Sequence, residues 1–168
     1  MPGLLESETT MLRLLTLFAA LLICAPAQAG DTIPQREGWV VHVTAMTYEE
    51  LLARMRPAIK SQGMGLVTQA GPTGVAAKRG ITIPGSRVFG VFNNKFAVRA
   101  IGTSISAMIE APIRMYVTGN PDGTATLSYK TPTHVFSPYF DEGGAELQAI
   151  AAELDQIFAA IAAAAIAE

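Results

Sequence analysis

Apolar and polar residues follow two different periods along this chain, and together they predict a mixture of strands and helices. Short runs rich in β-branched and aromatic side chains are typical of strands. Such runs cover residues 39–45, 66–70, 87–93, 113–118 and 124–129. The last two flank Asn120-Pro121-Asp122-Gly123, a turn sequence that predicts a β-hairpin.

A helix is expected directly after the first strand. Thr47 and Glu50 have the Thr-x-x-Glu spacing of a capping box, in which a hydroxyl and a carboxylate satisfy the free amides of a helix start. Apolar residues then recur at helical spacing, at Tyr48, Leu51, Leu52, Met55 and Ile59. Pro57 should kink or shorten this helix, because proline lacks an N–H group and clashes with the preceding turn.

The last predicted element is the clearest one, a long amphipathic helix. Its apolar stripe repeats at steps of three and four residues, at Leu147, Ile150, Leu154, Ile157, Phe158 and Ile161. Asp141 and Glu142 lie near its start, where the helix dipole favours negative charge. The alanine-rich residues 159–167 have little to bury, so this end is expected to fray. The stripe could serve a coiled-coil partner, but packing on the domain's own sheet is favoured.

The segments between these elements complete the predicted architecture. Residues 71–85 are expected to be mostly loop around a turn at residues 75–79, and residues 95–101 a short helix. Gly90 marks a bulge or a close backbone contact within its strand. This order of elements predicts an α+β fold, a two-layer sandwich of one mainly antiparallel sheet with helices packed on one face. A single domain over residues 39–168 is expected, with the amphipathic helix at its C-terminus.

The N-terminal segment has the pattern of a bacterial secretory signal peptide. Arg13 precedes an apolar run over residues 14–23, and the small-x-small sequence Ala27-Gln28-Ala29 follows. We expect residues 1–29 to be removed after Ala29, residues 30–38 to form a polar lead-in, and the mature protein to be periplasmic or secreted. The apolar run is shorter than the roughly 20 residues that span a bilayer, so no stable membrane insertion is expected after cleavage.

Two details of this leader leave alternatives open. Cys24 could carry a lipid, but Ile23 stands before it where lipoprotein signals have a small residue, so cleavage after Ala29 is favoured. The first ten residues also carry two acidic side chains where a signal should be positive. A start at Met11 would remove that anomaly, so translation from Met1 and translation from Met11 are both open.

Composition and charge argue against several classes of function. The net charge of −2 gives no electrostatic case for binding nucleic acid or an anionic membrane surface. Cys24 is the only cysteine and leaves with the predicted signal, so no disulfide or thiolate nucleophile is expected. His42 and His134 are the only histidines and have no ligand cluster near them, so we expect neither a metal nor a cofactor. The serines lie in no recognisable catalytic context, and no catalytic residue is assigned.

Alternation along the strands supplies the best candidate for a site. His42 should share a strand face with Val40 and Thr44, and Arg114 should share one with Tyr116. If the apolar faces lie under the helices, a semi-polar face with His42, Arg114 and Tyr116 remains. That face could form a two-fold homodimer, bind a small-molecule ligand or simply face solvent, and of the first two the homodimer is slightly favoured.

Several short motifs occur in a characteristic order along the chain. They are Pro112 with Arg114, the turn Asp122-Gly123, and Tyr129 with Pro132, preceded by residues 77–80, Pro84, and Asn93 with Lys95. In this order they resemble the bacterial family known as domain of unknown function 302, which has Leu-Pro-Leu-Lys, a hairpin and Ser-Tyr-x-x-Pro. The resemblance spans about residues 39–160 and implies a small α/β sandwich that is commonly dimeric, with no established reaction.

The chain departs from the family pattern at two places. Gly71-Pro72 stands near the position of the family's Asp-His pair, and Phe92-Asn93-Asn94 replaces its Gly-Asn-Pro. Any activity that needs the Asp-His pair would be absent here. The candidate ligand-binding residues are His42, Asn93, Arg114, Tyr116 and Tyr129.

The favoured function is a non-enzymatic one, that of an exported ligand-binding or accessory domain. The alternative is an enzyme acting on a small anionic compound, with Arg114 as the anion contact and His42 or Tyr129 as the proton-transfer group. The two hypotheses differ in whether His42, Arg114 and Tyr129 meet in one concave pocket. Strand alternation puts Tyr129 on the face opposite to Arg114 unless a bulge intervenes.

Overall fold

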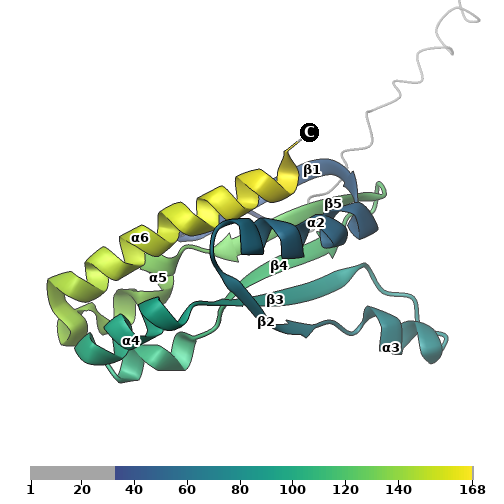
Figure 1. Cartoon of the computed structure of the whole chain (residues 1–168). Helices are drawn as coiled ribbons and strands as arrows, with labels where there is room; N and C mark the ends of the chain where they lie inside the picture. The colour runs from purple at the N-terminus through teal and green to yellow at the C-terminus, as the bar shows by residue number, and fades with distance from the viewer. Residues whose placement is uncertain (1–32, 168) are drawn as a thin grey trace, which may run out of the picture.

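The computed structural model describes residues 33–167, which form one five-stranded sheet with helices. In chain order the elements are β1 (Trp39–Thr47), α2 (Tyr48–Ser61), β2 (Gly65–Ala70), α3 (Thr73–Lys78), β3 (Ser86–Phe92), α4 (Asn94–Thr103), η1 (Ser106–Glu110), β4 (Ile113–Gly119), β5 (Thr124–Lys130), α5 (Pro132–Phe136), η2 (Ser137–Tyr139) and α6 (Phe140–Ile166). The strand order is β1-β5-β4-β3-β2, and every neighbouring pair is antiparallel. The long helices α2 and α6 lie on the same side of the sheet (Figure 1). The predicted two-layer α+β sandwich is therefore confirmed.

The start of α2 confirms the predicted capping box. The amide of Glu50 donates to Thr47 Oγ1 at 3.3 Å, and the amide of Thr47 donates to Glu50 Oε2 at 2.8 Å. The prediction that Pro57 shortens this helix is wrong, since α2 continues past it. Pro57 is exposed, whereas Met55 before it and Ile59 after it are fully buried. Core packing on both sides of the proline therefore outweighs the missing hydrogen bond.

The helix α6 packs against the sheet and the other helices through its apolar stripe. Its apolar stripe is buried as predicted, and Leu154 and Phe158 are 4 % and 0 % exposed. The alanine-rich end does not fray as expected, because Ala162 and Ala165 are themselves buried and the helix continues to Ile166. Small side chains at these positions let the helix lie close to its neighbours, so tertiary packing supplies the stability that helix propensity alone does not.

One described stretch, Pro132–Ile166, is apolar and long enough by composition to cross a membrane. It consists of α5, η2 and α6, and its apolar stripe packs on the sheet. The packing of this stripe inside the domain explains the apolar composition of the stretch, because a core helix needs apolar side chains along its buried face.

The side of the sheet beneath α2 and α6 is apolar, and we call it the covered face. Its buried residues are Phe89, Val91, Ile113, Met115, Val117, Ala125, Leu127 and Tyr129. His42 on β1 pairs with Leu127, and directly paired residues in an antiparallel ladder point to the same side. The prediction that His42 shares a face with Arg114 and Tyr116 is therefore wrong, because the pairing of β1 with β5 turns His42 towards the covered face.

The opposite side of the sheet, which we call the open face, carries a mixture of aromatic, aliphatic and polar side chains. It consists of Trp39, Val41 and Val43 on β1, Thr126, Ser128 and Lys130 on β5, Arg114, Tyr116 and Thr118 on β4, and Ser86, Val88 and Gly90 on β3. Val43 is 52 % exposed on this face, and Arg114 is also exposed. The predicted semi-polar face thus exists, with Trp39 on it in place of His42.

Gly90 makes the close backbone contact expected from the sequence. A Cβ atom at this position would collide with the Thr68 hydroxyl on β2 and would lie 2.9 Å from Pro112 Cγ. The absence of a side chain therefore lets β2 and the start of β4 approach β3 from both sides.

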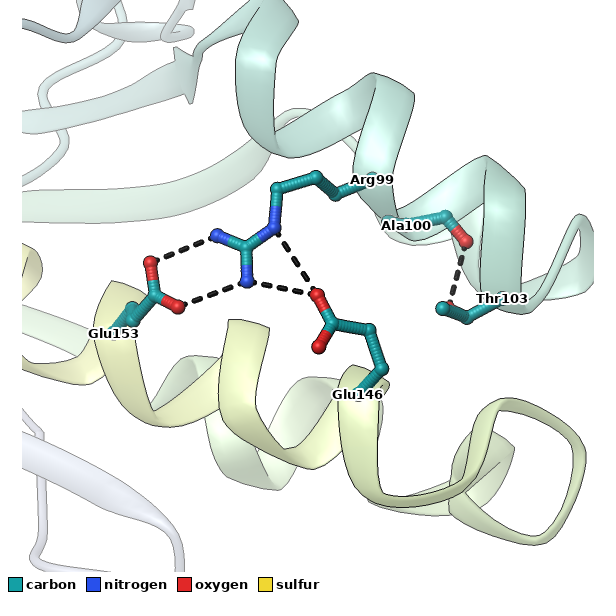
Figure 2. A network of polar contacts seen from close by, with 5 residues as sticks. All are labelled: Arg99, Ala100, Thr103, Glu146 and Glu153. Atoms are coloured by element: carbon teal, nitrogen blue, oxygen red, sulfur yellow. Dashed lines mark hydrogen bonds and ion pairs between the residues drawn. The ribbon is translucent and has the colours of Figure 1, made fainter.

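Arg99 connects α4 to α6 through two carboxylates (Figure 2). Its Nη1 and Nη2 atoms donate to the two carboxylate oxygens of Glu153 at 2.8 and 2.9 Å. Nε and Nη2 donate to Glu146 Oε1 at 3.2 and 2.9 Å. The hydrogen bonds from Arg99 lower the pKa of Glu153, and the two carboxylates raise the pKa of Arg99. This bidentate geometry fixes where α4 lies along α6.

Truncation of the buried stripe of α6 tests how much the fold depends on this helix. We expect Phe158→Ala or Leu154→Ala to lower the free energy of unfolding by roughly 2–5 kcal/mol, because each leaves a cavity against the sheet. Urea melts of the purified mature protein measure the change. Gln156→Ala, at an exposed position of the same helix, is the control and should leave the midpoint almost unchanged. A loss below about 0.5 kcal/mol in both core variants would contradict the packing of α6 on the sheet.

The bond between Arg99 and Glu153 predicts a dependence of stability on pH. The hydrogen bond from Arg99 lowers the pKa of Glu153 in the folded state, so the contribution of this bond to stability is complete above the unfolded pKa and is lost as pH falls through the lowered folded pKa. Glu153→Gln should therefore be less stable than wild type at neutral pH, and the difference should vanish in acid. Urea midpoints across the acid range measure it, with Glu37→Gln, at an exposed position outside the helices, as control. A difference that stays constant with pH would contradict the prediction.

Candidate functional site

A hollow of about 330 Å³ opens at one end of the open face, and we call it the Trp39 hollow. It lies where β1 begins, β5 ends and β4 begins, and the pairing of Trp39 with Lys130 holds the first two ends together. Its apolar and aromatic walls are formed by Trp39, Val88, Ile113, Tyr116, Tyr129 and Val135. Its polar lining consists of Glu110, Arg114, Ser128 and Lys130.

Two lining residues, Tyr116 and Ser128, carry hydroxyl groups that differ in their hydrogen bonding. Tyr116 and Ser86 exchange a hydrogen bond of 2.9 Å between their hydroxyl oxygens, which fixes the tyrosine ring on the open face. Ser128 is paired with Tyr116 on one side and Val41 on the other, is 0 % exposed, and its hydroxyl has no hydrogen-bond partner among residues 33–167. A buried hydroxyl without a partner costs about 1–3 kcal/mol, so Ser128 is an energetically unfavourable polar group beneath the hollow.

The rim of the hollow carries positive charge. Arg114 and Lys130 are both exposed lining residues, on the adjacent strands β4 and β5. The ammonium nitrogen of Lys130 lies 5.8 Å from the centroid of the Trp39 ring, and Cζ of Arg36 lies 5.5 Å from the same ring. The contact between Lys130 and the Trp39 ring favours a position of the ammonium group beside the hollow.

Glu110 is the one carboxylate in the lining of the hollow. Its Oε1 atom accepts a hydrogen bond of 3.0 Å from the Tyr139 hydroxyl, and this bond raises the pKa of Tyr139. Glu110 is therefore partly engaged by the protein itself. With Arg114 and Lys130 opposing it, the lining has an excess of one positive charge.

Tyr129 forms part of the inner wall and is only 4 % exposed. Its ring packs against Phe158 at a centroid distance of 5.7 Å. Burial raises the pKa of Tyr129, and the negative charge of Asp155 raises it further. Asp155 accepts hydrogen bonds from the amide and hydroxyl of Thr133 at 2.8 and 2.6 Å. Tyr129 therefore stays neutral at physiological pH.

Three of the predicted ligand-binding residues meet in the hollow. Arg114, Tyr116 and Tyr129 all line it, so Tyr129 reaches the same cavity as Arg114 although it belongs to the covered face. His42 is not part of the lining, because its strand register directs it to the covered face. His42 is therefore not positioned to transfer a proton to a compound bound at Arg114.

Asn93 also lies apart from the hollow and acts in the local structure. Its Oδ1 accepts from the Lys95 amide at 2.8 Å as the N-cap of α4, and its Nδ2 donates to the Gly63 carbonyl at 2.9 Å. It borders a separate apolar crevice of about 30 Å³ beneath α4. That volume is about the share of one water molecule in the liquid, too small for an organic ligand.

Seven of the ten lining residues were not among the site residues predicted from the sequence, including Trp39, Ser128 and Lys130. Alternation within a strand is visible in a sequence, but the offset of β1 against β5 is not. Trp39 was therefore expected on the face opposite to Arg114. The motif Ser128-Tyr129-Lys130 was available as a signal, since its three side chains all line the hollow.

The arrangement suits recognition of a small anion with an apolar part. Exposed cations on adjacent strands attract negative charge, and arginine can contact a carboxylate through two parallel hydrogen bonds. Within residues 33–167 no three His, Cys, Asp or Glu side chains come together, and the lining of the hollow itself has one carboxylate. Among the described residues the hollow thus offers binding groups rather than a set of metal donors.

The fold and the hollow define a small two-layer α+β domain with a semi-polar pocket at one end of its open sheet face. The chain belongs to the family described as Domain of unknown function DUF302, whose model matches residues 39–165. The resemblance inferred from the sequence motifs is thereby confirmed. A crystal structure of an uncharacterized conserved DUF302 protein from Bacillus stearothermophilus has a similar fold, with a TM-score of 0.65 at 20 % identity over 75 % of this chain and 96 % of that chain. No curated protein matches this chain.

Proposed function

We propose that this protein is an exported, non-enzymatic domain that binds a small molecule in the Trp39 hollow. The observation that carries the proposal is the hollow itself, about 330 Å³ of space bounded by aromatic walls and two exposed cations. Ligand pockets usually begin at about 300 Å³ and combine mostly apolar walls with a few placed polar groups. The Trp39 hollow meets both conditions.

Binding is favoured over catalysis by the protonation behaviour of the groups around the hollow. A general acid or base works best when its pKa lies near the working pH. Burial raises the pKa of Tyr129 away from neutrality, and His42 lies outside the lining. The enzyme alternative with Arg114 as anion contact would depend on Tyr129 alone, so the binding hypothesis needs fewer assumptions.

The proposal of export is motivated by the signal-like residues 1–29, which lie outside the described residues 33–167. We expect protein isolated from its native cell envelope to begin near Gly30 in intact-mass and N-terminal peptide analysis, because Ala27-Gln28-Ala29 has the form of a cleavage site. Detection of an acylated Cys24 or an intact leader in the envelope protein would contradict cleavage after Ala29. Translation from Met1 or from Met11 gives the same mature protein.

The hollow offers an internal reporter for ligand binding. Trp39 is the single tryptophan of the chain and lines the cavity, so an occupant should change its fluorescence. We expect native mass spectrometry of the mature protein, purified from its own envelope, to detect a small bound molecule. Returning that molecule to the stripped protein should shift Trp39 emission. Tyr116→Ala should weaken binding by about tenfold, which corresponds to the loss of one good contact.

His42→Ala provides the control for that experiment. His42 lies on a strand next to the hollow but points to the covered face, so its removal should leave the affinity within about twofold of wild type. Protein that carries no small molecule, and whose Trp39 emission no envelope extract changes, would contradict the binding function.

Light scattering distinguishes a ligand site from a homodimer interface. The open face also carries half-exposed Val43 and could pack against a second copy of the chain. In that case light scattering would find a dimer for the wild type and a folded monomer for the double variant Arg114→Glu, Tyr116→Ala. A dimer that dissociates in this way, with no ligand bound, would assign the face to assembly and overturn our proposal.

A further inference from the structure

We propose that the ligand of the Trp39 hollow is a small monocarboxylate with a flat apolar body, of the size of a single-ring aromatic acid. This inference rests on the proposed binding function and specifies its ligand class. The anionic group would lie between Arg114 and Lys130, and the body would lie against Tyr116 and the aliphatic walls.

The charge of the lining favours a single negative charge on the ligand. Arg114 and Lys130 contribute two positive charges, and Glu110 contributes one negative charge that the Tyr139 hydroxyl already contacts at 3.0 Å. One anionic group therefore neutralises the excess. A dianion would leave a net negative charge beside Glu110, which Coulomb repulsion disfavours.

The geometry of the two cations favours a planar head group. Arg114 is exposed and lines the hollow, and the forked face of a guanidinium matches a carboxylate through two parallel hydrogen bonds. Lys130 is a point charge held 5.8 Å from the Trp39 ring centroid. Because Arg114 and Lys130 line the same hollow from the adjacent strands β4 and β5, both can contribute to binding one anionic head group.

The walls and the size of the hollow define the rest of the molecule. Val88, Ile113 and Val135 supply apolar surface, and the Tyr116 ring is fixed by its hydrogen bond to Ser86. A rigid ring at the wall favours a flat partner, because offset or edge contacts between rings are stabilising. The volume of about 330 Å³ lies at the lower end of the range for ligand pockets, which favours a small body such as a single ring.

Benzoate is the probe that tests this ligand class, with benzamide as its uncharged analogue and acetate and inorganic phosphate as anions without a ring. Each is titrated into the stripped mature protein, with Trp39 emission and isothermal calorimetry as independent measurements. We expect benzoate to bind at least about tenfold more tightly than any of the three controls. Only benzoate combines a negative charge for Arg114 and Lys130 with a ring for the apolar walls. Its affinity should fall with added salt, because the cations at the rim are exposed.

Substitutions separate the anion contact from a general effect of charge. Arg114→Ala should weaken benzoate by about tenfold and bring its affinity close to that of benzamide. Arg36→Ala is the matched control, because Arg36 lies 5.5 Å from the same Trp39 ring but is not part of the lining. It should leave benzoate affinity within about twofold of wild type. Thermal melts establish that both variants are folded.

The outcomes distinguish this inference from the proposed function. Benzamide equal to benzoate would overturn the anionic head group, and phosphate or acetate equal to benzoate would overturn the apolar body. A neutral or cationic molecule carried by the envelope protein, with no response to benzoate, would overturn the ligand class while the binding function stands. Protein that carries nothing and responds to no probe would overturn both.

Discussion

The antiparallel pairing of β1 with β5 is the constraint on which the functional surface of this domain depends. Because directly paired residues point to the same side, the match of Trp39 with Lys130 puts a ring and an ammonium group together on the open face. A shift of one residue would exchange every side chain of β1 between the two faces. His42 would then lie on the open face, and Trp39 would be turned into the core.

The covering of one sheet face by α2 and α6 explains why a site can form on the other. The covered face has apolar side chains that are almost fully buried, and Phe158 of α6 packs on Tyr129 at 5.7 Å. These contacts supply the stability of the domain, so the open face need not be apolar. Its buried hydroxyl at Ser128 and its exposed cations are tolerated because the core does not depend on them.

The end of the sheet combines elements that are far apart in the chain. Trp39 comes from the first strand, Glu110 from the 3₁₀ helix before β4, and Val135 from the short helix after β5. Binding sites are commonly built in this way, from side chains at strand ends that a rigid scaffold positions. The cations Arg114 and Lys130 are then neighbours through the β-hairpin, whose turn fixes the register of β4 and β5.

The sequence alone determined the five strands, the helices α2, α4 and α6, the two-layer class and the family, because strand alternation, capping and helical stripes are local patterns. Residues 71–85, predicted to be mostly loop around a turn, contain the short helix α3, and the short helices η1, α5 and η2 were not predicted. The hairpin from β4 to β5 and the capping box at Thr47 required nothing from distant residues. Only the tertiary structure decided that α2 runs through Pro57, that the alanine-rich end of α6 stays helical, and that Trp39 rather than His42 joins Arg114. The first two features depend on packing between segments that are remote in the chain. The third depends on the register of β1 against β5, which the local sequence of either strand does not specify.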